Sequence, residues 1–141
     1  MMDQLALTWE LEETKHRQKS KPRLGVMING VRLTEIISQF EQQQGIGEFN
    51  DVFLHESDVQ EYSLFNWLKS LEEGDVRIIL LGCSCGQVEC SFFYANVCNR
   101  DGWVYWQFDG WPKRDYSEFP SFWFNASEYQ QVIEDALLHH Q

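Results

Sequence analysis

The chain has 141 residues, the usual size of one domain, and its 43% hydrophobic and 23% charged residues are typical of a globular protein. Its 11 Lys and Arg against 22 Asp and Glu give a net charge of −11, which disfavours contact with nucleic-acid phosphates. No apolar run reaches the ~20 residues of a membrane helix, and the N-terminal residues do not resemble a signal peptide. We therefore expect one cytoplasmic domain over 1–141, with its four cysteines as thiols.

The first part of the chain predicts strands and a hairpin. Apolar residues recur at every second position over 5–11, which predicts a strand with one buried face. A basic arm from Lys15 to Arg23 holds five of the eleven bases and no acid, and we expect a hairpin arm there. Asn29-Gly30, between two apolar segments, is a strong short-range signal for a hairpin turn.

Two helices are predicted next. Thr34 is a candidate N-cap for a helix that buries Ile36, Ile37 and Phe40 and ends near 45. The segment 45–56 shows no clear period and is predicted to be a loop. A capping-box pattern over 57–60 predicts a second helix, which stops before Gly74.

The second half of the chain returns to strands. The apolar run 76–81 predicts a central strand covered on both faces. Segments 91–98 and 103–108 predict two antiparallel strands joined by a turn, 109–121 a loop, and 122–124 a short strand. Asn125 is predicted to cap a last helix, whose apolar face is Tyr129, Val132, Ile133, Ala136 and Leu137. We expect an α+β fold with an antiparallel β-sheet and about three helices mostly on one face.

The four cysteines are spaced C-x-C-x4-C-x7-C, at Cys83, Cys85, Cys90 and Cys98. Structural zinc sites use four ligands, mostly from C-x2–4-C pairs, and this chain has no second matching pair. Cys83, Cys85 and Cys90 with His55 are the alternative metal ligands, and buried thiols in a turn are the simpler interpretation. A nucleophilic Cys83 or Cys85 with His55 as base has no local signature. We expect no cofactor.

The segment 80–90, together with later motifs, resembles a family of small bacterial proteins. The shared pattern is a strand that runs into Gly82-Cys83-Ser84-Cys85-Gly86, then Cys90, and later a Pro120–Phe124 element before a C-terminal helix. Ser91-Phe92 stands where the family usually has a Trp after its third Cys. The resemblance covers nearly the whole chain and implies a compact bacterial domain without an established activity.

The loop 109–119 is the strongest candidate for a recognition surface. It mixes large aromatic side chains, the usual anchors of protein interfaces, with acids that would steer a basic partner. The alternative is that its rings fold back onto the sheet as a lid. The candidate partner-binding residues are Asp109, Trp111, Asp115, Tyr116, Glu118 and Phe119.

These observations favour a non-catalytic protein-binding domain with a basic protein partner, such as an immunity protein that neutralises a cationic nuclease toxin. We find no catalytic set, and we expect neither nucleic acid nor a membrane as partner. The basic arm lacks interleaved aromatics for base stacking. The alternative function is a Cys-centred metal or thiol module, and the aromatic surplus equally suits a homodimer interface.

Overall fold

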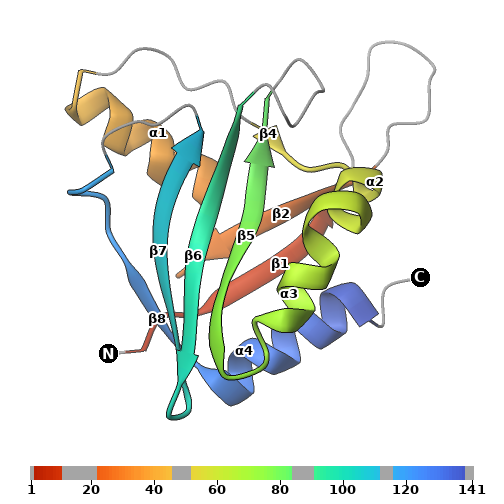
Figure 1. The fold of residues 1–141 in the computed structure, drawn as a ribbon. Coiled ribbons are helices and arrows are strands. Elements are labelled where there is room, and N and C mark those ends of the chain that lie inside the picture. The colour runs from red at the N-terminus through yellow and green to blue at the C-terminus, as the bar shows by residue number, and fades with distance from the viewer. Residues whose placement is uncertain (1, 11–21, 46–51, 84–90, 112–115, 139–141) are drawn as a thin grey trace.

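The computed structural model describes residues 2–10, 22–45, 52–83, 91–111 and 116–138, and within these ranges it contains two antiparallel sheets (Figure 1). The smaller sheet has the order β1 (Leu5–Glu10), β2 (Arg23–Ile28), β3 (Val31–Arg32). The larger sheet has the order β4 (Val52–Phe53), β5 (Gly74–Gly82), β6 (Phe92–Arg100), β7 (Trp103–Trp111), β8 (Phe122–Asn125). β1 and β2 cross behind β5, β6 and β7 (Figure 1).

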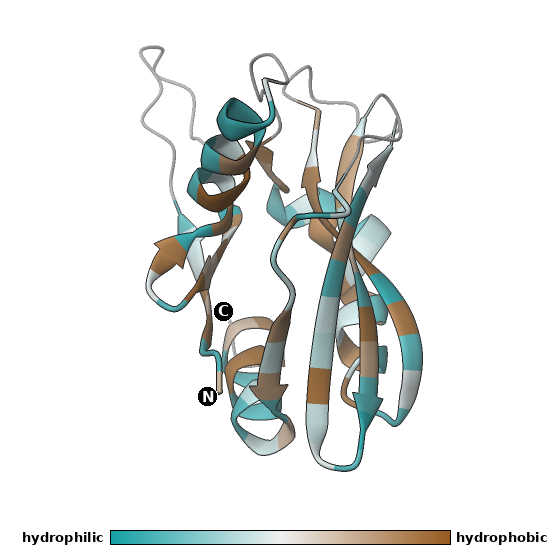
Figure 2. Cartoon of the chain, turned by 90° about the vertical axis from the view of Figure 1, so that its left-hand side faces the viewer, coloured by the Kyte–Doolittle hydropathy of each residue, from teal (hydrophilic) through white to brown (hydrophobic). Residues whose placement is uncertain are grey.

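Three helical segments complete the described fold. They are α1 (Leu33–Gln43), then α2 (Glu56–Asp58) continuing through the π-helical turn η1 (Val59–Ser63) into α3 (Leu64–Lys69), and α4 (Ala126–Ile133) followed by η3 (Glu134–Leu138). Figure 2 shows α1, α4 and the smaller sheet on one side of the larger sheet. The predicted α+β class is confirmed.

The strands of the larger sheet form because their sequences alternate with a period of two. Along β7, Val104, Trp106 and Phe108 are buried, whereas Trp103 and Trp111 are exposed. Successive side chains of a strand point to opposite faces, so this pattern assigns one face to the core and the other to solvent. The β6–β7 turn at Asp101-Gly102 has positive φ at both residues (56° and 83°), as a tight hairpin turn requires.

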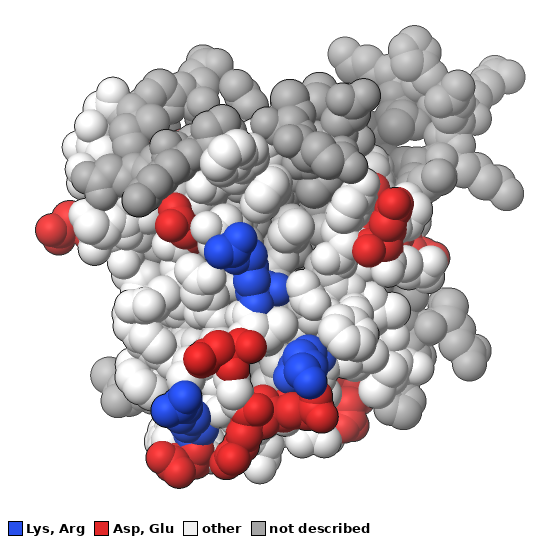
Figure 3. All heavy atoms as spheres, viewed as in Figure 1, with Lys and Arg blue, Asp and Glu red and all other residues white. Residues whose placement is uncertain are grey.

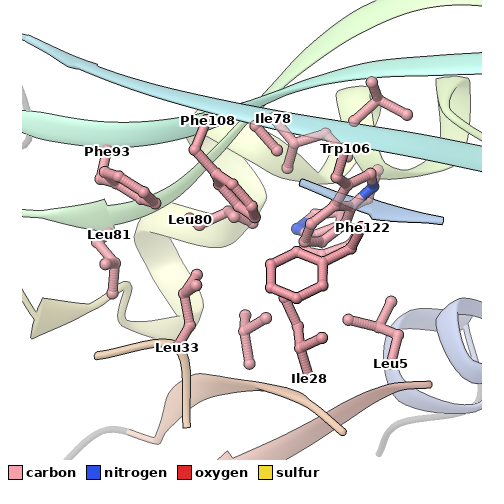
Figure 4. Close-up of a cluster of buried hydrophobic side chains, with 14 of the residues drawn as sticks. Leu5, Ile28, Leu33, Ile78, Leu80, Leu81, Phe93, Trp106, Phe108 and Phe122 are labelled. Carbon is pink, nitrogen blue, oxygen red and sulfur yellow. The ribbon is translucent and has the colours of Figure 1, made fainter. Parts of the chain in front are cut away.

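The core lies between the two sheets (Figure 4). Leu5, Ile28 and Leu33 come from the side of the smaller sheet and face Trp106 and Phe108 of β7, all of them buried. Each fully buried side chain of this size contributes about 1.5–3 kcal/mol of transfer free energy. The core therefore holds the inner face of the larger sheet firmly and leaves its outer face free of any described element.

A buried polar network fixes α3 and α4 against this sheet. The Ser70 hydroxyl donates to the carbonyl of Trp67 (2.6 Å) and lies 2.7 Å from the hydroxyl of Tyr129, and Asn99 Nδ2 donates to the Ser70 carbonyl (2.9 Å). Burial raises the pKa of Tyr129 well above its usual value, so its hydroxyl stays protonated. Trp106 packs between Trp67 and Tyr129, at ring distances of 5.7 and 6.1 Å.

Several predicted boundaries are wrong. Thr34 does not cap α1, because β3 runs directly into the helix. Arg32 occupies the N-cap position, and its side chain makes no capping hydrogen bond. Likewise α2 begins at Glu56 after His55, not at a Ser57 cap. The second helix ends at Lys69, and Gly74, with φ 128°, begins β5.

The strand and loop predictions also need adjustment. The predicted loop 45–56 contains β4, and β7 continues past the predicted strand end at 108 to Trp111. Ile79 on β5 is only half-buried, so the central strand is not covered on both faces along its whole length. Asn125 caps α4 as predicted, accepting from the backbone N–H groups of Ser127 and Glu128. Most of the basic arm, residues 15–21, lies outside the described residues.

Candidate functional site: the outer face of the larger sheet

The outer face of the five-stranded sheet carries three exposed tryptophans. Trp103 and Trp111 belong to β7 and Trp123 to β8, and their exposed fractions are 42%, 57% and 50%. They share one face because Trp103 and Trp111 are eight residues apart on one strand and Trp123 pairs with Tyr105 between them. Exposed aromatic side chains that gather on one face mark interaction sites more often than singly scattered apolar residues do.

One end of this face is an aromatic ledge formed by Trp103, Tyr105 and Trp123. Tyr105 and Trp123 are cross-strand partners with ring centroids 4.3 Å apart, and Trp103 precedes Tyr105 by two positions. The Tyr105 hydroxyl also accepts a hydrogen bond from Gln107 Nε2 (3.1 Å). The rings of Tyr105 and Trp123 restrict each other, so this pair loses little conformational entropy when a partner covers it.

The opposite end of the face has a second aromatic group. Trp111 pairs with Phe92 across β7 and β6, and the rings of Phe92 and Tyr94 lie 5.9 Å apart. The Arg77 guanidinium of β5 lies over the ring of Tyr94, 4.1 Å from its centroid, which is a cation–π contact. Asn96 pairs with Gln107 between the two aromatic groups. The face thus has two aromatic ends and a polar middle.

The charges on this face cancel, whereas its margin is acidic. By alternation along the strands, Asp75, Arg77, Arg100 and Asp109 lie on the outer face, two of each sign. The neighbouring segment 56–73, which runs through α2 and α3 up to β5, has five acids and one base, a net charge of −4. Figure 3 shows this side of the molecule, with basic side chains near its middle and most acidic side chains toward its lower edge and its sides.

Cys98 lies on this face as a free thiol, and its environment protects the protonated form. Its hydrogen bond to Asp75, with burial and the negative charge of Asp75, raises the pKa of the Cys98 thiol above its usual value. Because the thiolate is the nucleophile, a raised pKa makes Cys98 less reactive at neutral pH.

The structure separates the candidate residues of the 109–119 loop. Asp109 and Trp111 lie on the outer face of β7, and Asp109 Oδ1 accepts from the backbone of Gly110 (2.8 Å). Glu118 is exposed, and Asp115 lies outside the described residues. Tyr116 and Phe119 are each only 8% exposed. The expectation that these two rings form part of an exposed surface is therefore wrong.

Tyr116 and Phe119 are buried because the chain after β7 turns back over the inner face of the sheet. Phe119 contacts Phe40 of α1 edge-on at 5.0 Å and Phe108 at 5.2 Å. The Tyr116 hydroxyl donates to Oε1 of Glu41 (2.9 Å), a carboxylate that is only 1% exposed. The two rings thus fold back onto the sheet as a lid, which was the alternative interpretation of this loop. Helix α1 supplies the acceptor for the tyrosine hydroxyl.

Sequence analysis missed the aromatic ledge. The alternation in 103–111 and in 122–124 contained the signal, because Trp103, Tyr105 and Trp123 stand out of phase with the buried Val104, Trp106 and Phe124. What the sequence could not show was which of the two faces the helices cover. The buried Glu41 had no sequence signal, since it looks like any other acid on an amphipathic helix.

The alternative metal site is only partly within the described residues. Cys85 and Cys90 lie outside them, and Cys83 is half-buried. β4 pairs with the end of β5 through Val52 and Gly82, so the segment that leads to His55 runs beside the strand that leads to Cys83. In the described ranges, no three His, Cys, Asp or Glu side chains are grouped as they would be around a metal ion.

No helix in the described part of the chain is long and apolar enough to cross a bilayer. No protein-family model matches the chain, and neither the curated proteins nor the solved structures contain a significant match to it. The resemblance to small bacterial proteins with a Gly82–Gly86 motif stays a prediction.

Proposed function

We propose that this protein is a non-catalytic, cytoplasmic binding domain that docks a basic protein on the outer face of its larger sheet. In the most concrete form of the proposal it is an immunity protein, and its partner is a cationic toxin such as a nuclease. The observation that supports the proposal most strongly is the grouping of Trp103, Trp111 and Trp123 on one solvent-exposed face.

The aromatic part of the face has the chemistry of an interface centre. Tryptophan and tyrosine dominate the binding energy of protein interfaces because they bury large areas and have few rotatable bonds. Their exposure leaves apolar area in water, which is unfavourable by roughly 25 cal/mol for each Å² until a partner covers it. The balanced charges of Asp75, Arg77, Arg100 and Asp109 let this centre be desolvated without a large net charge.

The acidic margin explains why the partner would be basic. The chain carries 11 Lys and Arg against 22 Asp and Glu, and five of the acids lie in 56–73 beside the face. Charges at the rim of an interface accelerate association and select partners of opposite sign, although they add little to final affinity. Aromatic anchors surrounded by acids therefore fit a partner with an apolar patch inside a basic surface.

The first test is affinity capture from the native host by the tagged full chain at low salt. We expect a basic protein to be retained, and we expect retention to fall as salt rises, because salt screens the steering charges. Size-exclusion chromatography of the protein alone checks the homodimer alternative, which predicts an apparent mass of twice the monomer mass. A monomer that retains no protein at low salt would contradict the proposal.

The alternative function, a Cys-centred metal module, has one observation in its favour. The Nδ1 atom of His55 is buried and has no hydrogen-bond partner among the described residues, and β4 brings its segment beside the strand that leads to Cys83. Such a nitrogen is a natural ligand when a metal is close. Elemental analysis of untagged protein with a thiol titration tests this, since a zinc site predicts one zinc per chain and protected thiols. Four titratable thiols and no zinc would exclude it.

A further inference from the structure

A small pocket opens at the edge of the larger sheet, on the opposite side of β8 from the aromatic ledge. It has a volume of about 210 Å³ and lies between the N-terminal segment, β8 and α4. Small-molecule sites usually measure roughly 300–1,000 Å³, so this pocket has room for a single side chain rather than for a cofactor. Its lining residues are Asp3, Gln4, Leu5, Phe124, Asn125, Glu128, Tyr129 and Val132.

The lining combines apolar walls with two carboxylates. Leu5, Phe124, Tyr129 and Val132 provide the apolar surface, whereas Asp3 and Glu128 provide the charge. No base lines the pocket. This is the arrangement that suits a long cationic side chain, whose methylene groups pack on apolar surface while its charged end reaches an acid.

Asp3 is held in a fixed position. Its Oδ1 accepts from Asn29 Nδ2 (2.9 Å) and its Oδ2 from the backbone N–H of Trp123 (2.8 Å). Its own N–H donates to the Trp123 carbonyl (2.8 Å), which joins the N-terminal segment to β8. A carboxylate oxygen that has accepted one hydrogen bond can accept another, so Asp3 remains a possible acceptor for an incoming cation.

Glu128 counters the positive end of the α4 dipole at the pocket. It lies in the first turn of α4, and its backbone N–H donates to the Asn125 side chain (3.2 Å). The positive end of a helix dipole repels a cation. The carboxylate of Glu128 offsets this repulsion, and together with Asp3 it gives the pocket two acidic side chains and no base.

From this geometry we infer that the pocket between β8 and α4 binds an arginine or lysine side chain of the docked partner. The inference rests on the proposed function and adds a specific contact to it. Asp3 is bonded to the backbone of Trp123 in both directions, and β8 is the last strand of its sheet. A partner that covers the ledge and extends around this edge of the sheet therefore reaches the pocket. The ledge supplies apolar contact area, and the pocket selects for a basic residue beside it.

The test uses N-acetyl-arginine amide as the probe and N-acetyl-citrulline amide, its uncharged analogue, as the control ligand. Each is titrated into the full chain while backbone amide signals are followed by NMR. We expect the arginine compound, and not the citrulline compound, to shift the signals of Leu5, Trp123 and Glu128. Glu128→Gln should weaken arginine binding roughly two- to fivefold, the range of a solvent-exposed ion pair. The matched control Glu134→Gln, on the same helical segment but outside the pocket, should change it little.

Equal shifts with both compounds, or no shift near the pocket at the highest probe concentration, would overturn the inference. The same two variants then separate this inference from the proposed function. A captured partner that binds Glu128→Gln as tightly as the unchanged protein overturns the pocket contact alone. Arginine binding in the pocket without any captured protein supports the pocket and contradicts the proposed function.

Discussion

The aromatic residues of the 116–119 segment and those of the outer sheet face have similar chemistry and opposite environments. Tyr116 and Phe119 are each 8% exposed, whereas Trp123, only four residues after Phe119, is 50% exposed. The ring type does not decide this difference. On β8 the alternation of the strand forces Trp123 outward between the buried Phe122 and Phe124, while the preceding segment has no such constraint and turns its rings into the core.

The difference also follows from what covers each face of the sheet. Helices α1 and α4 and the smaller sheet lie on one side of the larger sheet, so side chains on the inner face gain partners there (Figures 1 and 2). Phe40 and Glu41 of α1 receive Phe119 and Tyr116 there. A sheet covered on one side normally has polar residues on the other side. Tryptophans in that position are an exception that a binding role explains.

Removing an inner tryptophan and removing an outer one should give very different losses of stability. Trp106→Ala removes a fully buried ring that contacts Trp67 and Tyr129, and it should lower the free energy of unfolding by about 3–5 kcal/mol. Trp111→Ala should change it by no more than about 0.5 kcal/mol. Urea denaturation of both variants measures the two values. Similar losses in both would mean that Trp111 is also part of the core.

Removing a single hydroxyl group from a buried and from an outer-face tyrosine compares the two environments more finely. Tyr116→Phe removes the donor to the buried carboxylate of Glu41 and should cost about 1–3 kcal/mol of stability. Tyr105→Phe, on the outer face, loses only an exposed bond to Gln107 and should cost no more than about 0.5 kcal/mol. Chemical denaturation again gives both values. If Tyr116→Phe lost as little stability as Tyr105→Phe, the Tyr116 hydroxyl would be exposed to water and not buried against Glu41.

Removing the observed cap of α4 and the wrongly predicted cap of α1 should give a smaller difference in stability. Asn125→Ala removes an acceptor for two backbone N–H groups of α4 and should cost about 1 kcal/mol. Thr34→Ala, at the predicted cap of α1, should have an effect within about 0.5 kcal/mol because no side-chain cap exists there. A loss of stability for Thr34→Ala as large as that for Asn125→Ala would contradict the assigned start of α1.

The outer face also predicts a pH effect on thiol reactivity, without a large change in stability. Because Asp75 raises the pKa of Cys98, less thiolate exists at a given pH and alkylation of Cys98 should become appreciable only at higher pH. Asp75→Asn should move the pH profile of Cys98 alkylation toward lower pH. Asp109→Asn, elsewhere on the same face, is the matched control and should leave it in place. Mass spectrometry of the alkylated peptide follows Cys98 separately from the other three cysteines.

The sequence predicted the class of fold well and the site poorly, for identifiable reasons. Periodicity located most strands and the Asn125 cap, because those features depend on neighbouring residues. It placed Tyr116 and Phe119 in the binding loop, because nothing local shows that α1 lies close enough to receive them. It also overlooked Trp103 and Trp123, since one strand read alone does not reveal which of its faces the remainder of the chain will cover.

The central claim is that the outer face of the larger sheet is the docking surface. The most direct measurement is the dissociation constant of the captured partner for the Trp111→Ala/Trp123→Ala double variant, with Phe65→Ala as the matched control. Phe65 is 75% exposed on α3 but lies off the sheet, so its loss tests general surface hydrophobicity. If the two tryptophans together contribute about 2 kcal/mol or more to binding, the dissociation constant should rise roughly 30-fold or more in the double variant and little in the control. Unchanged binding by the double variant, with its fold intact, would contradict the account.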